Sequence, residues 1–158
     1  MRIRKATVED ASLLLDLIKE KAEFDRQMKG FTGEVTTTVD KIESTLFGPQ
    51  PFAHAILLEV DNRVQGFALY HYRYSSFSGT PSIWLDDLLV VGAHRSKGYG
   101  RHILQTLSDI AEEHSVSHIS WTASPLNKRA HEFYVGLGAT IERWEGERPY
   151  FYWLINAK

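Results

Sequence analysis

The chain has 158 residues, a formal net charge of −2 and no cysteine, and we expect residues 1–158 to form one domain with its own core. The slightly acidic balance argues against a nucleic-acid partner, because such proteins usually carry a basic excess. The missing cysteines exclude disulfides, thiolate metal sites and a cysteine nucleophile. No apolar run follows the basic N-terminus or is long enough to cross a bilayer, so we expect a cytoplasmic location and no membrane contact.

The first half of the chain predicts one long helix and then strands joined by turns. Thr7 resembles an N-cap with Asp10 as its capping-box partner, and apolar residues at helical spacing predict a helix from about residue 8 into the mid-twenties. Residues 29–38 contain two glycines and four threonines and predict a loop, and residues 39–47 predict a short helix. Alternation and turn residues predict strands at residues 2–5, 53–60, 64–74 and 83–91.

The second half alternates helices with strands. A polar segment at residues 94–100 leads into a helix with an amphipathic pattern. Another amphipathic helix is predicted at residues 127–137, with Gly138 as its C-terminal stop. Strands are predicted at residues 117–123, 140–144 and 150–155. Together these elements predict a mixed sheet with helices packed on its faces.

The segment Arg95-Ser96-Lys97-Gly98-Tyr99-Gly100 predicts an anion site. It precedes a helix, whose first N–H groups have no internal partner and whose dipole favours negative charge, and glycine lets the backbone curl around a phosphate or pyrophosphate. A Rossmann fingerprint is excluded because position 103 is Ile103, and the order of lysine and glycine excludes a P-loop. A plain glycine-rich helix start on the surface is the alternative.

The same segment, Arg95-x-x-Gly98-x-Gly100 after an apolar strand, resembles the pyrophosphate signature of the GNAT superfamily of N-acetyltransferases. Residues 84–90 and 127–139 are similar to its central strand and its later Asn…Phe-Tyr…Gly-Ala segment. Residues 18–24, 51–54 and 66–70 resemble the diamine acetyltransferases of the spermidine/spermine type. The resemblance covers nearly the whole chain. It implies an α/β (α+β mixed) fold: a mostly antiparallel six- to seven-stranded sheet with two splayed parallel strands and helices on both faces.

The resemblance also implies an enzyme that moves the acetyl group of acetyl-CoA directly onto a primary amine of a small molecule, and a homodimer. The amine would belong to a diamine, a polyamine or a lysine-like amino acid. Acetylation of a protein or peptide amine is one alternative, and a non-catalytic acyl-CoA sensor is another. No metal is expected, because Val135 stands where a zinc motif starting at His131 needs its second histidine.

By the resemblance, acetyl-CoA lies between the strands at residues 83–91 and 117–123. Main-chain groups of Leu88, Leu89 and Val90 would bind the pantetheine arm, and an N–H near Leu88 would polarise the thioester carbonyl. The residues expected to contact the pyrophosphate or flank the cofactor are Arg95, Ser96, Lys97, Gly98, Tyr99, Gly100, Arg101, Asn127 and Ala130.

Tyr134 matches the family's general acid, which would protonate the departing thiolate beside the cofactor. A core tyrosine with a satisfied hydroxyl is the alternative. Asp86 matches the subgroup's acidic residue and is the predicted base, acting through water. Asp87 is the second candidate. Neighbouring side chains of a regular strand point to opposite faces, so only one of the two aspartates can face the amine unless a bulge intervenes.

Phe24 and Asp25 match the aromatic and acidic acceptor-binding positions of the subgroup, and Asp86 and Asp87 would complete the acceptor site. A carboxylate at Asp25 would hold a distal ammonium of the substrate. Arg26 and Lys29 stand where the polyamine enzymes keep further acid. This departure favours a shorter diamine or an amino acid with a side-chain amine. A solvated helix face is the alternative for the acidic residues here.

Overall fold

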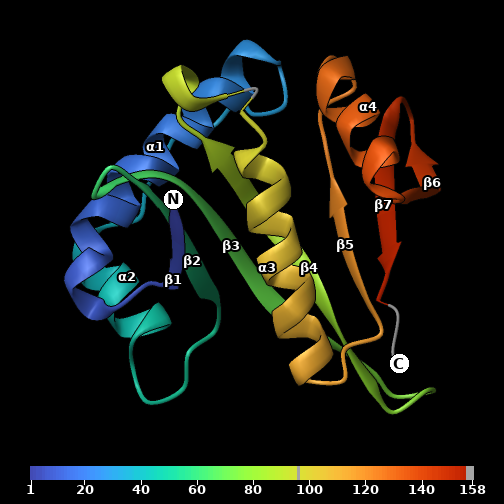
Figure 1. Ribbon diagram of the computed structural model, residues 1–158, viewed down its shortest axis with the longest axis horizontal. Coiled ribbons are helices and arrows are strands. Elements are labelled where there is room, and N and C mark those ends of the chain that lie inside the picture. The colour runs from blue at the N-terminus through green and yellow to red at the C-terminus, as the bar shows by residue number, and fades with distance from the viewer. Residues whose placement is uncertain (96, 156–158) are drawn as a thin grey trace.

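The computed structural model, which describes residues 1–95 and 97–155, contains one seven-stranded sheet with helices packed against it (Figure 1). The strand order is β1-β2-β3-β4-β5-β7-β6, and β4–β5 is the parallel pair. The strands are β1 (Arg2–Lys5), β2 (His54–Val60), β3 (Arg63–Ser75), β4 (Thr80–Val90), β5 (His118–Thr122), β6 (Thr140–Glu145) and β7 (Arg148–Leu154). The helices are α1 (Ala11–Gln27), α2 (Val39–Leu46), α3 (Tyr99–Glu113) and α4 (Lys128–Leu137). The predicted fold class is therefore confirmed.

Three elements begin two or three residues away from the predicted position, and most other boundaries differ by one residue at most. A 3-10 turn, η1 (Val8–Asp10), precedes α1, so the α-helix itself begins at Ala11. Strands β4 and β7 each begin before the predicted residue, because Pro81 and Pro149 lie inside them, paired with Tyr74 and Trp144. Both prolines are the second residue of their strand, where a missing N–H is tolerated.

Two apolar clusters cover opposite faces of the sheet. On one face, α3 and α4 pack on the strands through a cluster that includes Ile103, Leu107, Trp121 and Tyr134. On the other face, α1 and α2 pack through Leu14, Leu17, Ile42, Leu57 and Phe67. None of the helices within residues 1–95 and 97–155 has the length and apolar character needed to cross a membrane.

Strand β4 is irregular in its pairing with both of its neighbours, β5 and β3. It pairs with β5 only at Ile83–Ile119 and Trp84–Ser120, and the two strands diverge toward the first turn of α3 (Figure 1). Its ladder with β3 shifts register, because Tyr70 pairs with Leu85 whereas the preceding Leu69 pairs with Asp87. Asp86 is thus the extra residue of a β-bulge, which re-aims the side chains that follow it.

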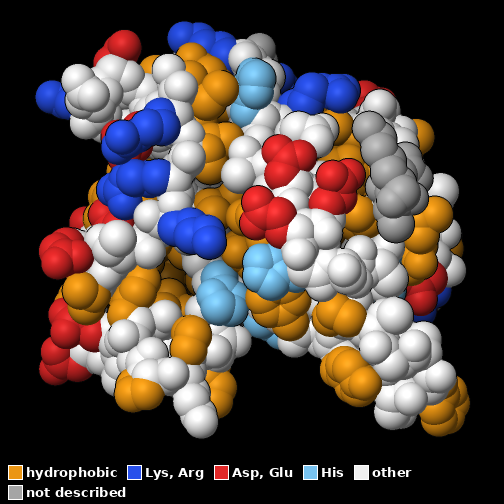
Figure 2. Space-filling view, turned by 60° about the horizontal axis from the view of Figure 1, so that its bottom comes forward, with side chains coloured by type: hydrophobic (Ala, Val, Ile, Leu, Met, Phe, Trp, Pro, Cys, Tyr) orange, Lys and Arg blue, Asp and Glu red, His pale blue; other side chains and the backbone are white. Residues whose placement is uncertain are grey.

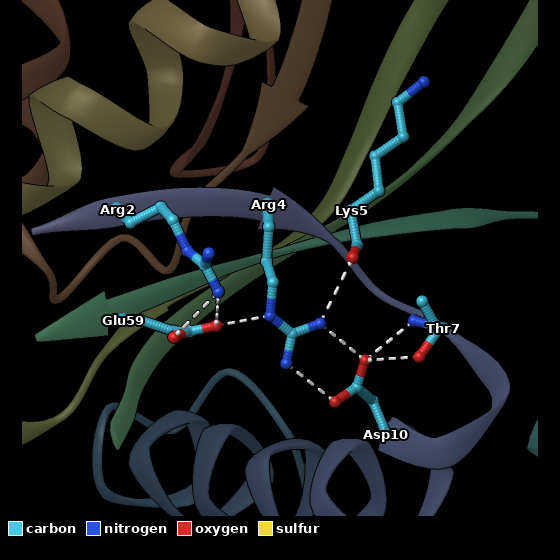
Figure 3. Close-up of polar contacts among 6 residues, drawn as sticks. All are labelled: Arg2, Arg4, Lys5, Thr7, Asp10 and Glu59. Carbon is cyan, nitrogen blue, oxygen red and sulfur yellow. Dashed lines mark hydrogen bonds and ion pairs between the residues drawn. The ribbon is translucent and has the colours of Figure 1, made fainter. Parts of the chain in front are cut away.

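A network of charged side chains fixes the start of α1 against the sheet (Figure 3). The Arg4 guanidinium donates to both carboxylate oxygens of Asp10 at 2.8 and 2.9 Å, and it also pairs with Glu59 on β2. Asp10 accepts a further bond from the Thr7 N–H at 2.7 Å, which closes the predicted capping contact. The Arg4 hydrogen bonds lower the pKa of Asp10 to about 2. The network sets the position of α1, whose far end reaches the candidate site.

Histidines gather where α3 ends and β2 begins. His54, Tyr72 and His114 are in ring contact, with centroids 5.5 and 5.8 Å apart. Figure 2 shows histidine side chains above the hollow between two projecting parts, with Lys and Arg side chains to their upper left and Asp and Glu side chains to their upper right. Burial lowers the pKa of His54, and the charges of Lys5 and His114 lower it further. His54 is therefore neutral at pH 7.

Candidate active site

A cleft of about 570 Å³ lies between the first turn of α3, helix α4 and the end of α1. The structure brings most of the predicted cofactor residues into its wall: Leu88, Leu89, Val90, Arg95, Gly98, Tyr99, Gly100, Arg101, Asn127, Ala130 and Tyr134, with Phe24 beside them. Lys97 is exposed and does not line the cleft, and Ser96 lies outside the described residues. Sequence reasoning missed Met28, His94, Arg129 and Phe133, which complete the wall.

The first turn of α3 presents main-chain donors to this cleft, and they have no hydrogen-bond partner among residues 1–95 and 97–155. Gly98 is the N-cap and has φ = +79°, a left-handed conformation that favours glycine. The first helical bond runs from the His102 N–H to the Gly98 carbonyl at 3.2 Å. The N–H groups of Tyr99, Gly100 and Arg101 therefore have no intrahelical acceptor. Such a turn suits a phosphate group.

Arg95 connects the loop before α3 to β4 and α1. Its Nε donates to the Val90 carbonyl at 3.0 Å, and its guanidinium carbon lies 4.7 Å from the centroid of the Phe24 ring. The Val90 carbonyl, which was expected to bind the pantetheine arm, therefore already accepts a hydrogen bond from Arg95. The cation–π contact holds the loop against α1.

Helix α4 begins at a capped asparagine and carries Tyr134 into the core. The Asn127 Oδ1 accepts from the Ala130 N–H at 3.2 Å, which stabilises the helix start. Tyr134 is only 9% exposed. Its ring packs against Trp121 and Phe151 with centroids 5.1 and 5.0 Å apart.

The Tyr134 hydroxyl is a free donor at the wall of the cleft. It has no hydrogen-bond partner among residues 1–95 and 97–155, and it lines the cleft. Burial raises the pKa of Tyr134 to about 12, and the charge of Asp25 raises it as well. The phenol therefore keeps its proton at neutral pH.

The bulge gives the two aspartates of β4 different environments. Asp86 is exposed and accepts from the Trp84 Nε1 at 3.2 Å. Asp87 is partly buried, and burial raises its pKa from 3.8 to about 6. Lys21 opposes this rise in the pKa, and Asp86 and Asp25 add to it. Since Lys21 and Asp25 belong to α1, Asp87 lies on the side of the sheet that faces α1.

Asp25 lies beside a cation that the sequence analysis did not consider. The Lys21 Nζ is 2.5 Å from the Asp25 Oδ1, one helical turn away on α1. Arg26 is directed elsewhere, because its guanidinium donates to Glu23 at 3.0 Å and to the Gly33 carbonyl at 3.2 Å. Lys29 is exposed. The positive charge next to Asp25 is thus that of Lys21.

Asp25, Asp86 and Asp87 do not line the cleft. They lie at or near the α1 side of β4, whereas the cleft extends toward α3 and α4. The described residues contain no group of three or more His, Asp or Glu placed to hold a metal ion.

Comparisons with known proteins agree with this arrangement. A sequence profile described as the acetyltransferase (GNAT) family matches residues 17–139. The chain is 29% identical to the Bos taurus thialysine N-epsilon-acetyltransferase over 145 residues, which is 87% of this chain and 82% of the relative. It is 24% identical over 185 aligned residues to the Arabidopsis thaliana L-ornithine N5-acetyltransferase, covering 89% of this chain and 79% of the relative.

Its fold is also similar to that of a solved structure, the tetramutant of the BH1408 protein from Bacillus halodurans. The TM-score is 0.79 at 21% identity, and the match covers 92% of this chain and 97% of the other. At this identity the likeness shows the fold alone. Since the family profile spans well over half of the residues, the chain belongs to the GNAT family of acetyltransferases.

Proposed function

We propose that this protein transfers the acetyl group of acetyl-CoA directly to a primary amine of a small molecule, a diamine or a lysine-like amino acid. Membership of the GNAT family supports the use of acetyl-CoA. Two of the relatives are named for acetylating the N-epsilon amine of thialysine and the N5 amine of L-ornithine. The observation that carries the proposal is a cleft that contains the helix-start N–H groups of α3 and a buried phenol, with carboxylates on the α1 side of β4.

The cofactor part of the proposal rests on the first turn of α3. The N–H groups of Tyr99, Gly100 and Arg101 would bind the pyrophosphate, and the side chains of Arg101 and Arg129 add positive charge at the cleft. The main chain of Leu88 and Leu89, where β4 has separated from β5, would hold the pantetheine arm. A volume of about 570 Å³ is within the range of small-molecule and cofactor sites.

Tyr134 is proposed as the general acid. When the amine nitrogen attacks the thioester carbon, the C–S bond breaks and the sulfur leaves with the electron pair. The Tyr134 phenol, which stays protonated because burial raises its pKa to about 12, would give its proton to that sulfur. A thiol has a reference pKa of about 8.5, so proton donation makes it a better leaving group.

Asp87 is proposed as the group that accepts the proton from the amine, directly or through a water molecule. An alkylammonium has a pKa of about 10 and must lose a proton before it can attack. A carboxylate whose pKa is about 6 is ionised at pH 7 yet is more basic than an ordinary aspartate. Asp86, the choice made from the resemblance, stays a second candidate, and its side chain is exposed.

The test is thiol release from acetyl-CoA across a panel of diamines, lysine-like amino acids, amino sugars and peptides, with the acetylated product identified by mass spectrometry. We expect turnover with diamines or lysine-like amino acids. Turnover with peptides alone would favour a protein acetyltransferase. Tight CoA binding without turnover on any amine would favour a sensor and end the proposal.

We also propose a homodimer, as the resemblance implies. Strand β6 is an exposed edge of the sheet, and it carries the exposed Ile141 and Trp144, with the exposed Leu154 on the neighbouring β7. Exposed strand edges and apolar side chains are features that subunit contacts cover. Light scattering at several protein concentrations should give twice the mass of the chain, 18.1 kDa. A constant monomer mass would exclude the dimer.

A further inference from the structure

Lys21 places an ammonium group beside Asp25, an acceptor-binding position by the resemblance, and near Asp87, the proposed base. Its Nζ lies 2.5 Å from the Asp25 Oδ1, and the two side chains are only 18% and 32% exposed. The charge of Lys21 also lowers the pKa of the Asp87 carboxyl on β4, against the larger effect of burial, which raises it. A lysine this far from solvent is uncommon, because long charged side chains normally extend into water.

We propose that Lys21 determines acceptor specificity by occupying the carboxylate that a second ammonium of the substrate would need. This inference rests on the proposed function, and on the acceptor-binding position that the resemblance gives to Asp25 at the distal end of the acceptor. A diamine whose second ammonium reaches Asp25 brings a second positive charge next to the Lys21 ammonium, which is already bonded to the Oδ1 of that carboxylate. The enzyme therefore disfavours diamines relative to acceptors that bring a negative charge with the second amine.

The charges around the acceptor position support this assignment. Asp25 and Asp87 carry up to two negative charges, and Lys21 cancels one of them. The neighbouring cation on the same helix, Arg26, is held by Glu23 and by the loop after α1. Like charges brought together in a partly desolvated site repel, so a second free ammonium is penalised next to Lys21.

A lysine-like amino acid meets a different set of partners. Its distal end carries an ammonium and a carboxylate on the same carbon. Lys21 can pair with that carboxylate while Asp25 accepts from that ammonium, so both charges of the site are satisfied. The same ion pair that obstructs a diamine thus complements a zwitterion, and we infer that the preferred acceptor is an amino acid with a side-chain amine.

Three acceptors of equal chain length test the inference: pentylamine, 1,5-diaminopentane and lysine. They present the same reacting aminomethyl end and differ at the other end of the chain. In the Lys21→Met variant, kcat/KM for 1,5-diaminopentane should rise about tenfold relative to pentylamine, the effect of one partly buried charge pair. The value for lysine should fall relative to pentylamine by a similar factor, because its carboxylate loses its partner.

The matched control is Lys19→Met, on the exposed face of the same helix, which should leave all three ratios unchanged. Lys21→Gln should repeat the result of Lys21→Met if the methionine variant folds poorly. The gain for 1,5-diaminopentane should vanish when Asp25→Asn is added to Lys21→Met, because the freed carboxylate is then gone.

The two proposals fail in different ways. If the wild-type protein acetylates none of the three amines, the proposed function fails and this inference fails with it. If the wild type acetylates them and the Lys21 variants keep the wild-type ratios, the inference alone is overturned.

Discussion

Replacing Asp87 with asparagine should stabilise the fold and slow the reaction at the same time. Burial raises the pKa of Asp87 from 3.8 to about 6. Each unit of pKa corresponds to about 1.4 kcal/mol, so the ionised carboxylate lowers the free energy of unfolding at pH 7.5 by up to about 3 kcal/mol. Asparagine is similar in shape and carries no charge, and it removes this cost.

The pH dependence has a definite sign. Because the pKa of Asp87 is raised in the folded state, the native protein binds this proton more tightly than the unfolded chain does. The resulting stabilisation is fully present below pH 3.8 and is lost as the pH rises through about 6. The advantage of Asp87→Asn over the wild type should therefore be greatest above pH 7 and shrink on acidification toward pH 4.

Urea unfolding at pH 7.5, 6 and 4.5 measures the stability difference, and steady-state thiol release measures kcat/KM. If Asp87 is the base, kcat/KM should fall by about 10²- to 10⁴-fold. Asp86→Asn is the matched control, since Asp86 is exposed, and it should change stability little. An Asp87→Asn protein that is less stable at pH 7.5 and fully active would refute both parts of the reasoning.

Three further variants test other parts of the structure. Tyr134→Phe should lower kcat by about 10²- to 10⁴-fold with little change in the Kd for acetyl-CoA. An unchanged kcat would show that Tyr134 is not the general acid. Gly98→Ala should weaken CoA binding in calorimetry, because the left-handed conformation costs a side chain about 1–2 kcal/mol, whereas Gly92→Ala in the same loop should not. The pKa of His54 is lowered, so the wild type should lose stability as the pH falls below 6.5, and His54→Gln should lose less over that range.

Elements with a strong apolar period were predictable from the sequence. The stripe of α3, including Ile103 and Leu107, is buried against the sheet. Apolar residues at helical spacing indicate which side of a helix is buried, and this can be predicted from neighbouring residues alone. The starts of β4 and β7 lie before the predicted residues, because Pro81 and Pro149 are turn signals locally, although proline is also tolerated near the start of a strand.

The candidate site was likewise predictable only in part. The α3 turn could be predicted, because a glycine before a helix start determines backbone geometry over a few residues. The bulge at Asp86 could not, since it depends on how β4 pairs with a strand that is distant along the chain. The Lys21–Asp25 pair was missed although its i, i+4 spacing is a usable signal. The cleft residues Met28 and Phe133 resemble core residues in sequence.

The bulge also determines which face of β4 each side chain near the proposed reaction occupies. Leu88 and Val90 pack against the cluster beneath α3 and α4, whereas Leu89 packs against the cluster beneath α1. Asp87 faces α1 as well, because its pairing partner Leu69 belongs to that face. A thioester and an amine would therefore reach β4 from its two sides and meet where β4 and β5 have parted. In that arrangement the amine attacks the thioester directly, and no enzyme nucleophile has to carry the acetyl group between them.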